Sequence, residues 1–314
     1  MRVFFTAVSA TLVCALAACN GLSQPSIPGN APFAGPAEPA SRTGVPDLYV
    51  ADYGVGSVVL LKNGSYAREG SITNGIDSPL DVALDREGNL YVANAASADV
   101  TEYLPGASSP SFTYSAGMVE PIFLTVGPKE NLYEVDSGGI GSDDGFVNEY
   151  RQRSAVVLHS CQTEGHPTGI AIDRTGNVFI GLNAASGGGR LVEYKRGLNG
   201  CIATLLGARF GHVVGLALDK RGDIVAADFN SGKVDVVSPP YAKITRRLTA
   251  GGRILQPTNI SIDAANARVY VTDFAKNVVF VLDYASGRVL RKLNNLHGGI
   301  SVPAGTSDGP NAVY

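Results

Sequence analysis

The chain has 314 residues, of which 45% are hydrophobic and 17% charged, and its formal net charge is −3. This composition provides enough apolar material for a sizeable folded core. The sequence has no basic block or stripe of the kind that nucleic-acid partners leave, so we expect no nucleic-acid partner.

The first segment has the pattern of an export signal. Arg2 precedes the apolar run "VFFTAVSATLVCALAA", which is short for a membrane span and predicts a signal peptide over residues 1–18. The run ends in Leu16-Ala17-Ala18-Cys19, which resembles the bacterial lipoprotein box. This resemblance implies that Cys19 is acylated and becomes the first mature residue. An ordinary secretory signal with an incidental cysteine is the alternative.

The lipoprotein resemblance also bears on location. It implies a lipid anchor in the bacterial cell envelope, and Asn20 is not the aspartate that signals retention in the inner membrane of enterobacteria. We therefore expect the outer membrane or the cell surface. Residues 19–46 continue as a Pro-, Gly-, Ser- and Ala-rich stretch that cannot bury a core, and this composition predicts a tether between anchor and domain.

From residue 47 onward the chain repeats one phrase. "LDREGNLYVAN" (84–94) returns as "IDRTGNVFIGLN" (172–183), "LDKRGDIVAAD" (218–228) and "IDAANARVYVTD" (262–273). The closing Asp or Asn of successive copies is 42, 42, 47, 45 and 45 residues apart. These closing residues are Asp52, Asn94, Asp136, Asn183, Asp228 and Asp273.

Each copy has the pattern of a hairpin followed by two further strands. Apolar residues alternate on both sides of an Asp-x-x-Gly-Asn turn, in which Asp can accept backbone N–H bonds and Gly takes a positive φ. A third segment such as "RLVEYK" (190–195) and a shorter fourth such as "GRVLRKL" (287–293) follow. Four antiparallel strands in about 40 to 50 residues predict a β-propeller blade.

Counting the copies predicts how the ring closes. The first unit, near residues 47–52, lacks an inner strand, while "GGISVPAG" (298–305) at the other end has the pattern of one. We therefore expect an all-β, six-bladed β-propeller over residues 47–305, with its first blade completed by the C-terminal strand and with a tail at 306–314. Such closure removes an open sheet edge.

The repeated wording Pro-x-[Gly/Asp]-[Ile/Val]-Ala-[Leu/Ile]-Asp-x-x-Gly-Asn resembles that of the NHL-repeat propellers. The resemblance covers the whole repeat region. It implies the fold but no activity, because the motif residues are those that a blade needs for its own turns.

Three histidines supply one hypothesis for chemistry. His166 and His212 occupy equivalent places before an inner strand, and His297 lies one place out of register. Histidine is a common metal ligand. The arrangement resembles that of the peptide-amidating lyase, in which three histidines hold zinc, although there the histidine directly precedes the Gly of the inner strand. Loop histidines with local hydrogen bonds are the alternative.

The loop "DSGGIGSDDGF" (136–146) supplies a second hypothesis. Asp136, Asp143 and Asp144 are oxygen ligands of the type that calcium prefers. A solvated Gly-rich loop is the alternative, and the strand-ending Asp or Asn of every unit is also expected to bond nearby backbone.

The lactonase relatives of this fold provide a comparison with an enzyme. The calcium-dependent gluconolactonase family uses Glu-Gly-Pro and Pro-Asn-Gly phrases, and the corresponding phrases here are "GVPDLYV" and "HPTGIAID". Two of its three metal ligands are therefore missing.

Two cysteines, Cys161 and Cys201, remain in the expected mature chain, in a compartment that permits disulfides. Relative to His166 and His212 they are offset by six residues, which is about 20 Å along a strand and argues against pairing. Whether they pair stays open.

These observations favour a cell-envelope lipoprotein whose propeller binds an unidentified protein or small molecule on its loop face. No blade carries a unique acid–base pair or nucleophile, so catalytic residues are unknown and no cofactor is expected. The alternative is a metal-dependent hydrolase or lyase that holds zinc or calcium at the central channel.

Overall fold

The computed structural model describes residues 48–62, 64–139, 143–296 and 298–308. The expected signal peptide, Cys19, the tether and His297 lie outside the described residues. Within them the protein is all-β, and only short 3₁₀ helices accompany the strands. No helix in these ranges is long and apolar enough to cross a membrane.

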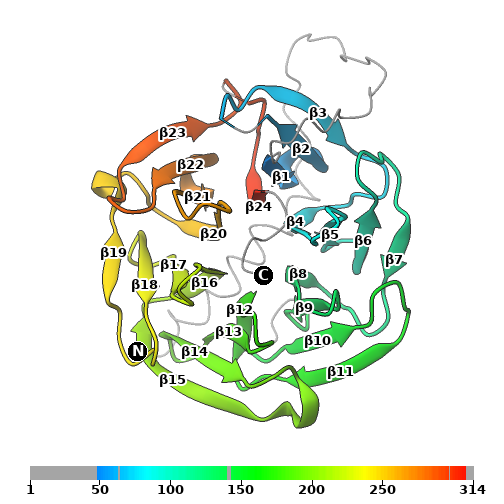
Figure 1. The fold of residues 1–314 in the computed structure, drawn as a ribbon, viewed down its shortest axis with the longest axis vertical. Helices are drawn as coiled ribbons and strands as arrows, with labels where there is room; N and C mark the ends of the chain where they lie inside the picture. The colour runs from blue at the N-terminus through cyan, green and yellow to red at the C-terminus, as the bar shows by residue number, and fades with distance from the viewer. Residues whose placement is uncertain (1–47, 63, 140–142, 297, 309–314) are drawn as a thin grey trace.

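The strands form six four-stranded antiparallel sheets arranged around a central axis, so the predicted six-bladed propeller is confirmed (Figure 1). The inner strands of blades 1 to 6 are β24 (Pro303–Asp308), β4 (Pro79–Leu84), β8 (Pro121–Val126), β12 (His166–Ile172), β16 (Val213–Leu218) and β20 (Pro257–Ile262). The second strands are β1 (Leu48–Asp52), β5 (Leu90–Asn94), β9 (Leu132–Asp136), β13 (Val178–Asn183), β17 (Ile224–Asp228) and β21 (Arg268–Asp273).

The third and fourth strands lie progressively further from the axis (Figure 1). The third strands are β2 (Ser57–Leu61), β6 (Asp99–Tyr103), β10 (Phe146–Tyr150), β14 (Gly189–Tyr194), β18 (Lys233–Val237) and β22 (Val278–Asp283). The outer strands are β3 (Arg68–Ile72), β7 (Phe112–Tyr114), β11 (Val157–Gln162), β15 (Ala203–Phe210), β19 (Arg246–Leu248) and β23 (Val289–Leu293). The 3₁₀ helices are η2 (Tyr53–Val55), η3 (Asn199–Cys201), η4 (Ala250–Gly252) and η5 (Phe274–Lys276).

The core lies between adjacent blades. Side chains alternate between the two faces of a strand, and each blade face packs on a neighbouring blade, so both faces are apolar. In β1, Leu48 and Val50 pack with Tyr270 of blade 6, whereas Tyr49 and Ala51 pack with Val92 of blade 2. The alternating apolar pattern of each repeat therefore specifies two inter-blade contacts.

The ring closes in blade 1 between the two ends of the described chain. β24 pairs antiparallel with β1, and Leu48 lies opposite Asp308. The closing strand is Pro303–Asp308 and extends past the expected boundary at 305. The shift arises because Pro303 corresponds to the proline that begins three other inner strands and is the second residue of β12, while the preceding residues form its entry loop. The N–H groups of Ser301 and Val302 donate to Asp52 at 2.7 and 2.8 Å.

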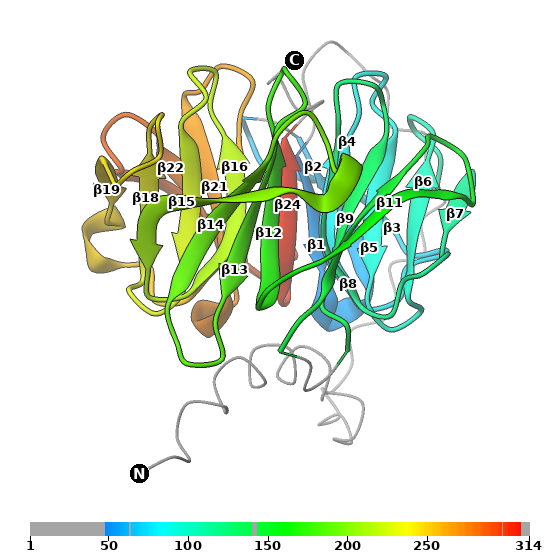
Figure 2. The same ribbon diagram turned by 90° about the horizontal axis from the view of Figure 1, so that it is seen from below.

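The hairpin turns use the expected mechanism. Asp85 Oδ1 accepts the Asn89 N–H at 2.8 Å, and Asp173 Oδ1 accepts the Asn177 N–H at 2.9 Å. Gly176, in the second of these turns, has φ +86°. These turns lie at one end of the inner hairpins, and the entry loops lie at the other end, which we call the loop face (Figure 2).

Candidate functional site

The strand-ending Asp and Asn residues form a ring at the loop face, which we call the loop-face ring. Its members bond the entry loop of an inner strand: Asp228 accepts the N–H groups of Gly211 and His212, both at 3.0 Å. Asp273 likewise accepts the Leu255 N–H at 2.7 Å. The members are Asp52, Asn94, Asp136, Asn183, Asp228 and Asp273, each at most 4% exposed. This arrangement accounts for their recurrence in every blade.

Blade 4 departs from this rule in a way that gives Asp144 a role. Asn183 bonds the following blade, because its Nδ2 donates to the Val213 carbonyl at 2.7 Å and its Oδ1 accepts the Val213 N–H at 3.0 Å. The entry loop of blade 4 is held by Asp144 Oδ1, which accepts the Gly165 N–H at 3.0 Å. Asp144 therefore accepts the entry-loop N–H of blade 4, which in most other blades bonds the strand-ending Asp or Asn.

The three carboxylates of the predicted Asp136–Asp144 site have different surroundings in the structure. The Asp136 carboxylate is buried and accepts the N–H groups of Val119, Glu120 and Gly138 at distances from 2.6 Å. Asp143 is exposed, and Asp144 holds Gly165. No group of three or more His, Cys, Asp or Glu side chains within the described residues has a metal-binding arrangement.

His166 and His212 lie in adjacent blades at the entry to their inner strands, 7% and 6% exposed. Burial lowers the pKa of His166, and burial together with His166 lowers the pKa of His212 to about 4. Both rings are therefore neutral near pH 7. His166 Nδ1 has no hydrogen-bond partner among the described residues, while the His212 ring packs edge-on to Phe229.

Glu120 occupies the position in blade 3 that His166 and His212 occupy in blades 4 and 5, since each precedes the first residue of the aligned inner-strand motif. Its Oε2 accepts the Ser137 hydroxyl at 2.6 Å. Burial raises the pKa of Glu120. The histidines were predicted from the sequence but Glu120 was not; its position directly before the inner-strand proline, Pro121, is the signal that identifies it.

A second ring lines the central channel at the residue two places after the start of each inner-strand motif. We call it the channel ring, and its members are Asp81, Phe123, Gly169, Gly215, Asn259 and Gly305. The glycines permit close approach of the inner strands: a Cβ at Gly215 would lie 2.6 Å from the Asn259 Cα. A Cβ at Gly305 would lie 2.6 Å from Asp81 Oδ1. The three larger side chains therefore share the space that the glycines leave.

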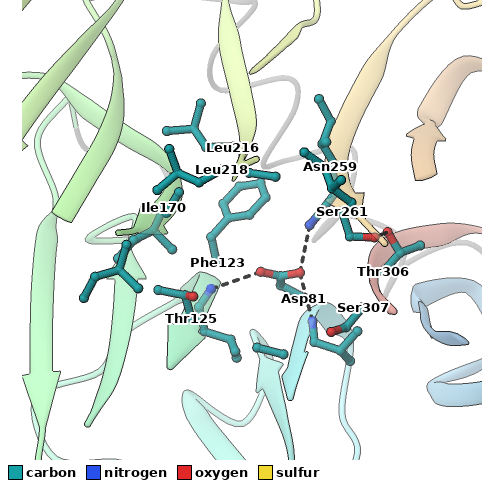
Figure 3. Close-up of a pocket in the computed structure, with 18 residues that line it drawn as sticks. Asp81, Phe123, Thr125, Ile170, Leu216, Leu218, Asn259, Ser261, Thr306 and Ser307 are labelled. Atoms are coloured by element: carbon teal, nitrogen blue, oxygen red, sulfur yellow. Dashed lines mark hydrogen bonds between the residues drawn. The ribbon is translucent and has the colours of Figure 1, made fainter. Parts of the chain in front are cut away.

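Asp81 reaches across the channel to blade 6 (Figure 3). Its Oδ1 accepts the Val82 N–H at 2.9 Å and the Asn259 Nδ2–H at 2.8 Å, and its Oδ2 accepts the Leu124 N–H at 3.0 Å. Burial raises the pKa of Asp81 to about 7, against the lowering effect of these bonds. The surrounding cavity has a volume of about 60 Å³, which admits water or a small ion. The departure from Gly at this position is the only sequence signal for Asp81.

A further buried carboxyl, Glu134, lies in β9 where blade 2 has Val92. Asn148 Nδ2 donates to its Oε2 at 3.0 Å, and its Oε1 has no partner among the described residues. Burial, followed by the Asp136 charge, raises the pKa of Glu134 well above its usual range. This carboxyl is fully buried within the blade.

Cys161 and Cys201 form a disulfide, with Cα atoms 5.3 Å apart. Cys161 is in β11 of blade 3, and Cys201 ends η3, before β15 of blade 4. The expected offset does not apply because Cys201 lies in a turn that contacts β11 rather than at an equivalent strand position. The pairing joins two adjacent blades at their outer edge.

The fold places the protein among the six-bladed β-propellers. No family model and no curated protein sequence matches the chain. Among solved structures, it is similar to a protein of unknown function from Bacteroides caccae, with a TM-score of 0.66 and 14% identity, covering 84% of this chain and 99% of that one.

Two further structures share the architecture. One is a chain of a nidogen/laminin complex, with a TM-score of 0.67, 16% identity and coverage of 85% of this chain and 99% of that one. The other is a functionally unknown protein from Desulfotomaculum acetoxidans, with a TM-score of 0.56, 13% identity and coverage of 81% and 83%. At these identities the similarity concerns the fold.

Proposed function

We propose that this protein is a binding module that presents its loop face to a protein partner. The observation that carries the proposal is a set of exposed aliphatic side chains on the loop face. Val55, Val119 and Leu255 are 58%, 56% and 52% exposed. They lie in loop-face segments of blades 1, 3 and 6, where they offer apolar surface to a protein partner.

The polar residues of the same face support binding over catalysis. The loop-face ring is engaged with backbone groups, as Asp228 is with Gly211 and His212. The channel cavity, at about 60 Å³, is much smaller than a pocket for an organic substrate. The nidogen/laminin structure offers a limited parallel, since it contains a chain of this fold within a protein complex.

Attachment through Cys19 would fit this function. Leu48 and Asp308 are paired at the end of blade 1 opposite the loop face. A lipid-anchored tether that joins the domain at Leu48 would therefore attach at the face opposite the loop face. Acyl labelling tests the anchor: Cys19→Ala should abolish incorporation of labelled palmitate and leave an unprocessed precursor, whereas wild-type labelling would contradict it.

Surface substitutions test the binding function. The triple variant Val55→Asp, Val119→Asp and Leu255→Asp should lose a partner that cross-linking recovers from the cell envelope, without a change in melting temperature. The matched control replaces exposed aliphatic residues elsewhere, Val156→Asp and Ile202→Asp, which are 62% and 77% exposed. Equal recovery by both variants would overturn the loop-face assignment.

The second candidate is a metal-dependent hydrolase or lyase. The observation that favours it is the buried Nδ1 of His166, which has no partner within the described parts of the chain and lies near His212 of the adjacent blade. Elemental analysis of the purified protein separates the two functions. Stoichiometric zinc that is lost in His166→Ala and His212→Ala would favour the enzyme, while metal-free protein that melts identically with chelator would favour the binding module.

A further inference from the structure

The central channel gathers oxygen atoms around one buried carboxylate. The three groups that donate to Asp81 are neutral: two backbone N–H groups and the Asn259 amide. No Lys, Arg or His side chain is among the described residues that line the cavity. A buried carboxylate that keeps its charge normally has a cationic partner, because neutral hydrogen bonds recover only part of its hydration.

The second observation is an unsatisfied hydroxyl in the same cavity. Ser307 of β24 is 2% exposed, and its Oγ has no hydrogen-bond partner among the described residues. Figure 3 shows Ser307 beside Asp81 at the channel wall. By contrast, the nearby Ser261 hydroxyl bonds the Thr306 hydroxyl at 2.8 Å. A buried hydroxyl without a protein partner indicates a missing ligand or water.

The cavity has the size for a small ion. Its volume is about 60 Å³, enough for an ion with one or two waters and too small for an organic ligand. At the end remote from the loop face, Ala217 and Ile262 line it and are partly exposed, which gives an ion a route from solvent.

We infer that the central channel binds one small hard cation, Na⁺ or Ca²⁺, through oxygen atoms of Asp81, Asn259 and Ser307. Carboxylate, amide and hydroxyl oxygens are the ligands that such ions take, and water completes the shell. One carboxylate supplies little ligand charge, so Ca²⁺ affinity falls in the weak range, with a dissociation constant of about 0.1–1 mM. This site is independent of the loop-face binding function.

The bound ion would join three blades. Asp81 belongs to blade 2, Asn259 to blade 6 and Ser307 to blade 1, which the two chain ends complete. A cation that contacts all three binds the closed ring and not the unfolded chain, so it raises the melting temperature.

The test uses the purified protein after chelator treatment and exchange into choline chloride. We expect equilibrium dialysis to find about one ²²Na⁺ or ⁴⁵Ca²⁺ per chain. At a hundredfold excess over the dissociation constant, the same ion should raise the melting temperature by about 5 °C. Binding of either ion supports the site and identifies its charge; binding of neither overturns it.

Variants locate the ion. Asp81→Asn should abolish binding, and Ser307→Ala should weaken it about tenfold. Since the Ser307 hydroxyl makes no bond within the described protein, that variant should fold even where Asp81→Asn does not. The matched control is Asp85→Asn, a buried carboxylate in a hairpin turn outside the cavity. It should lower the melting temperature while keeping ion binding. Undiminished binding by Ser307→Ala and Asp81→Asn would place the ion elsewhere and overturn the inference.

Discussion

Two rings of equivalent positions encircle the propeller axis, and they differ in regularity. The loop-face ring is Asp or Asn in each blade, and most members accept N–H groups of the entry loop. The channel ring is Asp, Phe, Gly, Gly, Asn and Gly, and its side chains meet across the axis. Repetition therefore marks residues that each blade needs for itself, whereas departure from the repeat marks residues that act once for the whole ring.

The largest expected effect on stability comes from removing β24 and its entry loop, because this deletion disrupts the channel ring and the loop-face ring at once. Deleting residues 298–314 removes β24, with Gly305 and the entry loop bound to Asp52. It should abolish cooperative melting, because β1 and two neighbouring inner strands lose their partner. Calorimetry measures this, and deletion of 309–314 alone is the control that should melt like the full chain. Equal melting of both truncations would contradict closure by β24.

A smaller effect should follow from filling the channel ring. Gly305→Ala places a Cβ 2.6 Å from both the Asp81 Cα and Oδ1. We expect a loss of about 3 kcal/mol in the free energy of unfolding, measured by urea titration, because the inner strands must move apart. Gly70→Ala, also in a strand of blade 1 but with nothing within 4 Å, should change stability by less than about 1 kcal/mol. Similar losses in both variants would refute the packing role of the glycine.

The loop-face ring should tolerate a single loss somewhat better. Asp52→Ala leaves the N–H groups of Ser301 and Val302 without their acceptor and should cost about 2 kcal/mol by the same titration. Asp143→Ala, which removes an exposed carboxylate of the loop face, should be close to neutral. A neutral Asp52→Ala would show that the regular ring is not structural.

The smallest expected effect concerns Glu134, a buried carboxyl that belongs to neither ring and stands where blade 2 has Val92. The pKa of Glu134 in the folded chain lies above the ordinary value of 4.5, so its contribution to stability is present below pH 4.5 and is lost as pH rises through the folded pKa. Glu134→Gln should therefore melt increasingly above wild type, by a few degrees, as pH rises. Exposed Glu69→Gln should show no such trend, and a constant offset for Glu134→Gln would contradict the titration.

The repeat made the fold predictable because equivalent residues perform the same structural function in most of the blades. The alternation of apolar residues predicted the strands, and Asp85 with its equivalents predicted the hairpin turns between them. Closure by the C-terminal strand was predictable because the first unit lacks an inner strand. The expected boundary at 305 was too early, because the strand begins at Pro303 and extends to Asp308.

Contacts between blades were less predictable, since they join residues far apart in the chain. Asp81 meets Leu124 and Asn259, which are 43 and 178 residues away. Cys161 pairs with Cys201 because η3, which holds Cys201, contacts β11. The comparison of strand positions could not predict this contact, because η3 lies outside the strands. Asp144 replaces Asn183 at one entry loop, an exchange that becomes visible only with the bond partners.

The order in which strands leave the ribosome gives blade 1 a distinct history. Blades 2 to 6 are each continuous in sequence and can form as soon as they are synthesised, whereas β1 must wait for β24. Until Asp308 emerges, the nascent chain is an open arc in which β1 lacks its partner strand and β20 of blade 6 lacks its neighbour β24. The native ring can therefore close only after β24 has been synthesised, so blade 1 is the last blade to be completed.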